Sequence, residues 1–184
     1  MKLLEEVYKE RCETPSDINE HLPTLRRYAE ECEHITEMGV RSVVSTFAFL
    51  MGYPKKLISY DIDPLEKWGV KTEDLIQLGK ENKIEFEFKI ANTLDLEIEE
   101  TDLLFLDTDH TYNQVKGELR LHGNKSRKYI VFHDTTTFEF SGMNGDTIGL
   151  WSAIEEFMNV NPHWVVCERF YNNNGLTILK RIYE

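Results

Sequence analysis

Short apolar runs alternate with amphipathic segments along most of the chain. Apolar runs rich in strand-forming residues occupy positions 34–39, 56–61, 84–90, 102–107 and 129–134. Between them, residues 45–51, 72–80, 112–122 and 150–158 place apolar side chains at helical spacing. The run at 102–107 is apolar throughout, as in a buried parallel strand, whereas the run at 84–90 alternates, which favours a place nearer an edge. Strands that alternate with helices predict an α/β fold with a parallel sheet.

The two ends of the chain differ from this alternating middle. Residues 1–12 predict a short amphipathic helix, and a second helix is predicted after Asp17. Near the other end, strand-like runs at 164–170 and 176–183 flank the sequence Asn172-Asn173-Asn174-Gly175. An Asn-Gly pair between two such runs is a strong hairpin signal. The last strand is therefore expected to be antiparallel.

The composition is that of one acidic globular domain. The 184 residues include 21 Lys and Arg against 33 Asp and Glu, which gives a formal net charge of −12. This length suits a single domain, with N-terminal helices in residues 1–32 and the sheet in residues 33–184. The negative charge argues against binding to nucleic acid or to anionic membranes, because both need a basic surface.

Cysteine usage and the apolar runs favour a cytoplasmic protein. The three cysteines are scattered and have no disulfide-framework spacing, as expected for reduced thiols. The N-terminus acquires Glu5 and Glu6 at once, unlike the apolar region of a signal peptide. No run approaches the roughly 18 apolar residues of a membrane span.

Polar side chains gather where the predicted strands end. In an open α/β sheet, ligands bind beyond the carboxyl ends of the strands, so these positions are candidates for a site. A single acid there is as well explained by the polarity of loops, but the whole set is not. The set comprises Glu37, Gly39, Asp61, Asn92, Thr93, Asp107, Asp109, His110, His133 and Asp134.

Asp107 and Asp134 are the candidate metal ligands. They lie side by side if their strands are neighbours, and crowded carboxylates raise each other's pKa unless a cation lies between them. Mg²⁺ prefers such oxygen ligands, whereas His133 as a third ligand would favour Mn²⁺, Fe²⁺ or Zn²⁺. His110 is the candidate general base, because the pKa of an imidazole lies near neutrality. The alternative for His110 is a hydrogen bond at the start of a helix.

The loop after the first strand favours a nucleoside ligand. Gly39 would let the backbone approach the ligand closely, but Arg41-Ser42-Val43 fills the positions of the later glycine in a dinucleotide fingerprint. Ser45 and Thr46 offer hydroxyls at the start of the next helix, where ordinary capping is the alternative. Asp61 is placed to accept both hydroxyls of a ribose. A nucleoside without a pyrophosphate fits this pattern better than NAD.

These motifs together resemble class I S-adenosylmethionine-dependent methyltransferases. The similarity is to the small metal-dependent O-methyltransferases of the cephalosporin hydroxylase and macrolide-sugar methyltransferase branch, and it covers residues 33–183. It implies a Rossmann-like, mainly parallel seven-stranded sheet of order 3-2-1-4-5-7-6, with the last strand antiparallel and helices on both faces. The motifs are Glu37-x-Gly39, Tyr60-Asp61-Ile62-Asp63-Pro64, Asn92-Thr93, Phe105-Leu106-Asp107-x-Asp109-His110 and Phe132-His133-Asp134.

The resemblance also implies roles for single residues. Glu37 and Gly39 would hold the methionine part of S-adenosylmethionine, and Asp61 would hold its ribose. Asn92 or Thr93 would lie by the adenine. Asp107, beside the cofactor, would bind Mg²⁺ together with Asp134, and His110 would be the general base. His133 stands where the sugar-methylating members carry a metal-binding glutamate.

The expected function is methyl transfer to a hydroxyl of a small acceptor, such as a sugar, a glycan or a natural product. The loop from Thr135 to Leu150 is long for a connection and is expected to cover that acceptor. Two alternatives are a non-catalytic nucleoside-binding module of the same fold and a metal-dependent hydrolase that uses the Asp and His residues at 107–110 and 133–134. The N-terminal helices either dock on a second subunit of a homo-oligomer or cover the sheet.

Overall fold

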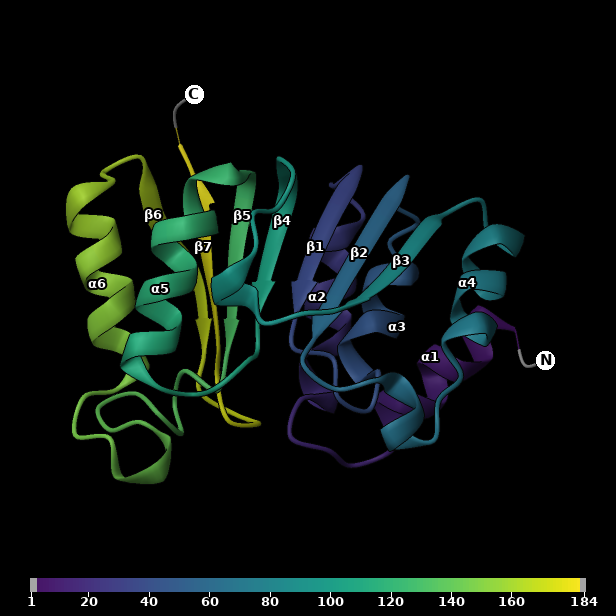
Figure 1. The fold of residues 1–184 in the computed structure, drawn as a ribbon, viewed down its shortest axis with the longest axis horizontal. Coiled ribbons are helices and arrows are strands. Elements are labelled where there is room, and N and C mark those ends of the chain that lie inside the picture. Colours follow the sequence, from purple (N-terminus) through teal and green to yellow (C-terminus); the bar gives the residue numbers. More distant parts are fainter. Residues whose placement is uncertain (1–2, 183–184) are drawn as a thin grey trace.

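The computed structural model describes residues 3–182, and its centre is a seven-stranded sheet of order β3-β2-β1-β4-β5-β7-β6 (Figure 1). Strand β7 is antiparallel to both of its neighbours, β5 and β6. The order and the antiparallel last strand are as expected, although residues 1–2 and 183 of the predicted end elements lie outside the described range. The strands are β1 (His34–Met38), β2 (Lys56–Asp61), β3 (Glu85–Ile90), β4 (Thr101–Leu106), β5 (Ser126–His133), β6 (Trp164–Phe170) and β7 (Leu176–Arg181).

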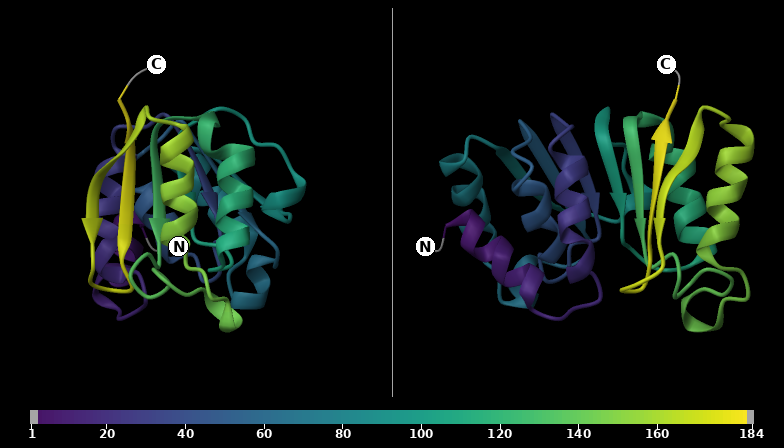
Figure 2. Two further views of the ribbon diagram at one scale, coloured as in Figure 1. Left: turned by 90° about the vertical axis from the view of Figure 1, so that its left-hand side faces the viewer. Right: turned by 180° about the vertical axis from the view of Figure 1, so that it is seen from behind.

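Helices cover both faces of the sheet, as expected. Figure 2 shows α1 (Leu4–Glu13), α2 (Leu22–Ala29) and α3 (Val44–Leu50) on one face. The opposite face carries α5 (Tyr112–His122) and α6 (Leu150–Val160), and α4 (Thr72–Glu81) packs beside the edge strand β3. The connection from β3 to β4 crosses the face that α5 and α6 cover, and Ile98 of this connection is buried there.

The sheet separates two apolar layers, and the strands contribute to both. Leu103 and Phe105 of β4 pack with the helices of the first face, whereas Leu104 and Leu106 pack with α5 and α6. Every residue of β4 is buried. This explains why the run is apolar from Leu103 to Leu106, because a strand covered on both faces has no solvent side.

The N-terminal region is less regular than its pattern predicts. The second predicted helix is broken into a 3₁₀ turn, η1 (Asn19–His21), followed by α2, which has a proline in its first turn. The Ser16 hydroxyl accepts the backbone N–H of Asn19 at 3.0 Å, within η1, and α2 itself has no side-chain cap. The 3₁₀ turns η2 (Leu65–Trp68) and η3 (Thr93–Asp95) are likewise short elements that hydrophobic periodicity does not reveal.

The hairpin between β6 and β7 docks against this N-terminal region. Asn173, Asn174 and Gly175 all have positive φ angles, of 45°, 68° and 95°, as the Asn-Asn-Gly sequence favours. The Asn173 side chain accepts the backbone N–H of Glu20 at 3.1 Å and donates to the Ser16 carbonyl at 2.8 Å. Two distant parts of the chain are thereby joined at the edge where the parallel strands end.

Within residues 3–182, none of the helices combines the length and the apolar character that a bilayer crossing requires.

Candidate active site

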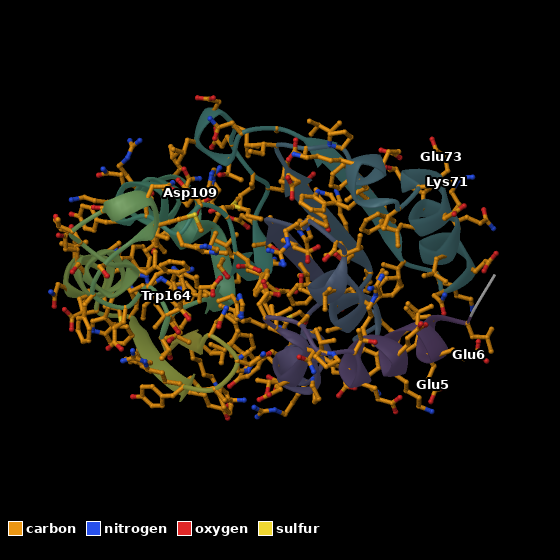
Figure 3. The ribbon with its side chains drawn as sticks, turned by 90° about the horizontal axis from the view of Figure 1, so that it is seen from below. Glu5, Glu6, Lys71, Glu73, Asp109 and Trp164 are labelled. Carbon is orange, nitrogen blue, oxygen red and sulfur yellow. The ribbon has the colours of Figure 1, made fainter. Side chains whose placement is uncertain are left out.

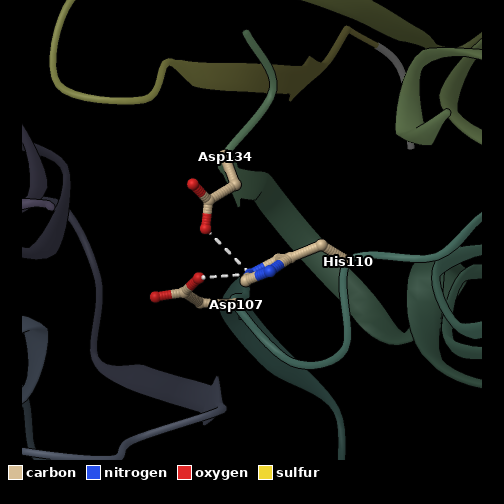
Figure 4. A group of neighbouring side chains, drawn as sticks. All are labelled: Asp107, His110 and Asp134. Atoms are coloured by element: carbon tan, nitrogen blue, oxygen red, sulfur yellow. Dashed lines mark hydrogen bonds and ion pairs between the residues drawn. The ribbon is translucent and has the colours of Figure 1, made fainter. Parts of the chain in front are cut away.

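Two acidic strand ends meet at the centre of the sheet. Strands β4 and β5 are parallel neighbours, and Leu106 pairs with Phe132. Asp107 and Asp134 follow these strands, and both turn toward His110, which lies in the loop before α5 (Figure 4). The register of two adjacent strands, not nearness in the sequence, brings this cluster together.

The His110 imidazole lies between the two carboxylates. Its Nε2 is 2.8 Å from Asp134 Oδ2 and 3.3 Å from Asp107 Oδ1. Burial alone would lower the pKa of His110, but the hydrogen bonds to both carboxylates raise it to about 9. Burial would raise the pKa of Asp134, but hydrogen bonds from His110 and His133 hold it well below its usual range. Thr111, not His110, caps α5, so the capping alternative for His110 is wrong.

His133 is fixed as a hydrogen-bond donor on the other side of the carboxylates. Its Nδ1 lies 3.2 Å from Asp107 Oδ1 and 3.3 Å from Asp134 Oδ2. Its Nε2 faces the carbonyl oxygens of Asp17 at 3.0 Å and Asn173 at 3.2 Å, which can only accept. Although burial opposes its charge, the two carboxylates raise the pKa of His133 to about 11.

Asp107, His110 and Asp134 form a group that fits a divalent cation. One ligand atom from each lies within 4.8 Å of the others. Asp134 Oδ1 is buried without a hydrogen-bond partner among the described residues, and its lone pairs would suit a cation. The Asp134 backbone has a φ of 60°, a strained conformation of the kind often found at functional sites. His133, the predicted third ligand, is not part of this group.

A pocket of about 530 Å³ opens beside the cluster, over the ends of β1, β2 and β4. Its volume lies within the roughly 300–1,000 Å³ usual for small-ligand sites. Of the residues predicted to bind the cofactor, the pocket is lined by Gly39, Asp61, Asn92, Thr93 and Asp107. Asp109 also lines it, and Figure 3, which views this end of the molecule, shows Asp109 on the α5 side of the sheet.

Asp61 both shapes the pocket and retains capacity for a ligand. One carboxylate oxygen accepts the backbone N–H groups of Val40 at 2.8 Å and Arg41 at 2.9 Å, and the other accepts that of Asp63 at 3.0 Å. A carboxylate has about four lone-pair positions, so about one remains for a ligand hydroxyl. Asp61 therefore fixes the loop after β1 while facing the pocket.

Gly39 allows that loop to approach β4. Its φ of 86° is a left-handed conformation that favours glycine. A Cβ atom at this position would lie 2.0 Å from the Asp107 carbonyl oxygen. The close approach that the structure shows is to the backbone of Asp107, and the approach of a ligand to Gly39 stays a prediction.

Three other predicted cofactor residues form a buried network instead of lining this pocket. Glu37 is fully buried, and its carboxylate accepts hydrogen bonds from Ser45 at 2.6 Å, Thr46 at 2.8 Å and Ser59 at 2.6 Å. Burial raises the pKa of Glu37 to about 7, although these hydroxyls lower it. Neither Ser45 nor Thr46 caps α3, whose first turn has no side-chain cap.

Glu118, a second buried glutamate beside the pocket, was not predicted from the sequence. Glu118 of α5 is fully buried and accepts hydrogen bonds from Thr93 at 2.6 Å, Thr108 at 2.8 Å and Gln114 at 2.9 Å. Thr93, Thr108 and Gln114 all line the 530 Å³ pocket. The sequence did contain a signal, which is an acidic residue on an apolar helix face: Glu118 lies on the face formed by Val115 and Leu119.

A smaller pocket of about 110 Å³ contains the side of the cluster that faces the N-terminal region. Asp107 and Thr108 line both pockets, whereas His110 and Asp134 line only the smaller one. Asp17 also lines the smaller pocket, and nothing in its local sequence pattern indicated this. Only the docking of the N-terminal region onto the hairpin brings Asp17 to the site.

The predicted acceptor-covering loop lies against His110. Phe138 stacks on the His110 ring, with centroids 4.9 Å apart and an interplanar angle of 9°. The backbone N–H of Met143 donates to the His110 carbonyl at 2.8 Å, and Met143 also lines the larger pocket. The loop is therefore placed next to both pockets, with Phe140 in its middle 76% exposed.

The fold is that of solved methyltransferase structures, although no protein-family model matches the chain and no curated protein is significantly similar. A putative O-methyltransferase from Klebsiella pneumoniae is similar over 100% of this chain and 91% of its own, at 15% identity and a TM-score of 0.68. The O-methyltransferase from Bacillus cereus in complex with SAH is similar over 97% and 90%, at 16% identity and a TM-score of 0.66. A putative caffeoyl-CoA O-methyltransferase from Staphylococcus aureus is similar over 98% and 93%, at 12% identity and a TM-score of 0.68.

The class that these observations define is the Rossmann-like methyltransferase fold, with the sheet order that the chain itself shows. At such identities the likeness concerns the fold, so the chemistry rests on the chain's own residues.

Proposed function

We propose that this protein is an S-adenosylmethionine-dependent O-methyltransferase that acts on a small hydroxylated acceptor with the help of a divalent cation. One observation carries the proposal: a pocket of nucleoside size and a pocket containing an imidazole and two carboxylates meet at Asp107. A methyl donor and a hydroxyl acceptor need such neighbouring sites, because the transfer requires them in line and close together. The fold, which SAH-bound methyltransferases share, supports this arrangement.

In this proposal the larger pocket binds the cofactor. Asp61 accepts a ribose hydroxyl, and Asn92 or Thr93 lies beside the adenine. Gly39 lines the same pocket and lets the loop after β1 pass close to the backbone of Asp107. The exposed apolar side chains of Ile62 and Trp68 line the same pocket and can cover the flat face of the base.

His110 is assigned the role of general base. When the cofactor is bound, its sulfonium supplies an electrophilic methyl group, and a hydroxyl oxygen must lose its proton as it attacks. A cation held by Asp107 and Asp134 would lower the pKa of that hydroxyl. It would also compete with His110 for the carboxylate oxygens, leaving Nε2 free to take the proton. Mg²⁺ suits the two carboxylates and would leave His110 Nε2 uncoordinated, as the role of base requires.

The acceptor is proposed to be small, a sugar, one end of a glycan, or a natural product. The 110 Å³ pocket leaves little space beside His110. The loop that carries Phe138 and Phe140 can pack against the acceptor and exclude water. A sugar ring suits these side chains, because it has apolar C–H faces as well as hydroxyls.

Calorimetric titration with S-adenosylhomocysteine, with and without Mg²⁺, tests the proposal. Micromolar binding together with methyl transfer to hydroxylated acceptors would support it. Binding without any turnover across an acceptor panel would favour the non-catalytic nucleoside-binding module. Absence of binding under both conditions would refute it, and phosphatase turnover that a chelator abolishes would then favour the hydrolase.

A further inference from the structure

Arg41 and Asp17 form an ion pair at the junction of the two pockets. Arg41 Nη2 lies 2.7 Å from Asp17 Oδ2, and the side chains are 59% and 35% exposed. Arg41 lines both pockets, and Asp17 lines the smaller one. Among the described residues that line either pocket, Arg41 is the one Lys or Arg side chain. We propose that this pair binds the zwitterionic amino-acid end of the cofactor.

In this assignment, which rests on the proposed function, Arg41 holds the α-carboxylate and Asp17 accepts from the α-ammonium group. A guanidinium offers five N–H donors in a planar fork, and the contact with Asp17 uses one terminal nitrogen. The remaining donors can bind a carboxylate without breaking the pair. Because the pair and the ligand end are each neutral overall, they fit without leaving an uncompensated charge.

The other groups that could bind the amino-acid end of the cofactor already have hydrogen-bond partners within the protein. Glu37, to which the family resemblance assigns the methionine part, is fully buried, and its carboxylate accepts from three hydroxyls. Ser45 and Thr46 donate their hydroxyl hydrogen bonds to the Glu37 carboxylate. At the junction of the two pockets, the Arg41 and Asp17 side chains are therefore the more accessible charges, since the Asp107 side chain is only 22% exposed.

The backbone around Arg41 is also held in an unusual conformation. Arg41 and Val43 have positive φ angles of 45° and 63°, which cost L-residues energy. The Asp61 carboxylate accepts the backbone N–H of Arg41 at 2.9 Å and keeps the loop in place. A glycine at position 41 would form this turn with less strain, so the arginine side chain needs a reason of its own.

The test compares two ligands that differ only in the amino-acid end. S-adenosylhomocysteine carries it, and methylthioadenosine lacks it. Arg41→Gln should weaken S-adenosylhomocysteine binding roughly tenfold to a hundredfold, the loss expected for one hydrogen bond between charged groups. Binding of methylthioadenosine should stay within about twofold, because Arg41 does not hold the nucleoside in this assignment.

Arg127→Gln is the matched control, because Arg127 also pairs with an aspartate, Asp102, at 3.1 Å and is 52% exposed, but lines neither pocket. It should leave both affinities unchanged. An equal loss of both ligands in Arg41→Gln, or no loss of either, would overturn the assignment while the wild type still binds. A wild type that binds neither ligand would refute the proposed function, and the assignment with it.

Two further ligands separate the roles within the pair. Arg41→Gln should not weaken binding of decarboxylated S-adenosylhomocysteine, which lacks the carboxylate, whereas Asp17→Asn should. The deaminated analogue should show the reverse pattern. If each variant weakens both analogues alike, the pair merely shapes the pocket and the assignment is wrong.

Discussion

At the scale of single residues, His110 contacts both the carboxylates of the cluster and the loop after β5. Its Nε2 contacts both carboxylates of the cluster, while Phe138 stacks on its ring and limits its orientation. His110 lines the smaller pocket but not the larger one. A base placed in this way can act on an acceptor without touching the nucleoside.

Replacement of His110 by alanine should therefore separate turnover from cofactor binding. We expect His110→Ala to lower kcat by about 100-fold or more, the usual contribution of a general base. The Kd of S-adenosylhomocysteine should change by less than about threefold, because the larger pocket is left intact. The control is His163→Ala, because His163 forms a hydrogen bond with Asn124 and lines neither pocket. Parallel losses of turnover and affinity would show that His110 has a structural role.

Asp134 allows a separate test of the cation. Asp134→Asn should weaken Mn²⁺ binding, measured by calorimetry without cofactor, by about tenfold or more, because an amide is a poorer ligand than a carboxylate. Asp109→Asn is the matched control, since Asp109 lies in the larger pocket outside the three-residue group. A wild type that binds no Mn²⁺ would show that His110 and His133 neutralise the carboxylates in place of a metal.

The residue scale also shows what one sequence can reveal about a site. Asp107, His110 and Asp134 were predicted together, because parallel strands deliver their ends to one edge and those ends were polar. Arg41 and Asp17 were not predicted as a pair. Their contact spans 24 positions and depends on how the N-terminal region packs, which no local pattern encodes.

At the scale of elements, α5 acts as a support for the larger pocket. Its buried face carries Glu118, which holds Thr93 from the loop after β3 and Thr108 from the loop after β4. His122 of the same face lies 2.8 Å from the Thr93 carbonyl. One helix thus fixes two loops that belong to different strands.

Glu118→Gln should consequently impair cofactor binding more than catalysis. A glutamine offers one acceptor oxygen in place of two, so at least one of the donors from Thr93, Thr108 and Gln114 loses its partner. We expect KM for the cofactor to rise about tenfold, with kcat within about threefold. Glu156→Gln on α6 is the control, because Glu156 pairs with Lys116 on the surface. A fall in kcat with unchanged KM would contradict this role.

Periodicity identified elements better than it located their breaks. The helix at 112–122 and the strand at 56–61 have the predicted bounds, because each presents a complete apolar face to the core. The break between η1 and α2 was missed, since the helical spacing of Leu22 and Leu25 lies within α2 and does not show where the helix begins. Hydrogen bonds from Ser16 and Asn173 set that break, and only the first is local in sequence.

At the scale of the whole molecule, the N-terminal region and the last hairpin contribute to the site at the carboxyl ends of β4 and β5. The alternation of elements predicted a parallel sheet and the resemblance implied its order, which delivers Asp107 and Asp134 to one edge. The carbonyls of Asp17 and Asn173 then close over His133. Those contacts link the N-terminal region, β5 and the last hairpin, so the geometry of the site depends on the folding of the entire chain.

The free energy of unfolding should depend on pH in part through one buried acid, Glu37. Glu37 is fully buried beneath the loop after β1, and burial raises its pKa from 4.5 to about 7, with Asp107 adding to the rise. The folded state therefore binds more protons than the unfolded state between about pH 4.5 and pH 7. Stability due to this group is greatest below that interval and falls as the pH rises through it.

The comparison that isolates Glu37 is the wild type against Glu37→Gln, which keeps the shape and cannot ionise. The shift in the pKa corresponds to a loss on the order of 3 kcal/mol in the wild type from pH 4.5 to pH 7. The free energy of unfolding of Glu37→Gln, measured by urea denaturation, should gain on the wild type by that amount across the same interval. Other titrating groups, including Asp107 and His133, contribute to both proteins and largely cancel in the difference. A constant difference across the interval would mean that Glu37 is ionised throughout, held by Ser45, Thr46 and Ser59 despite its burial.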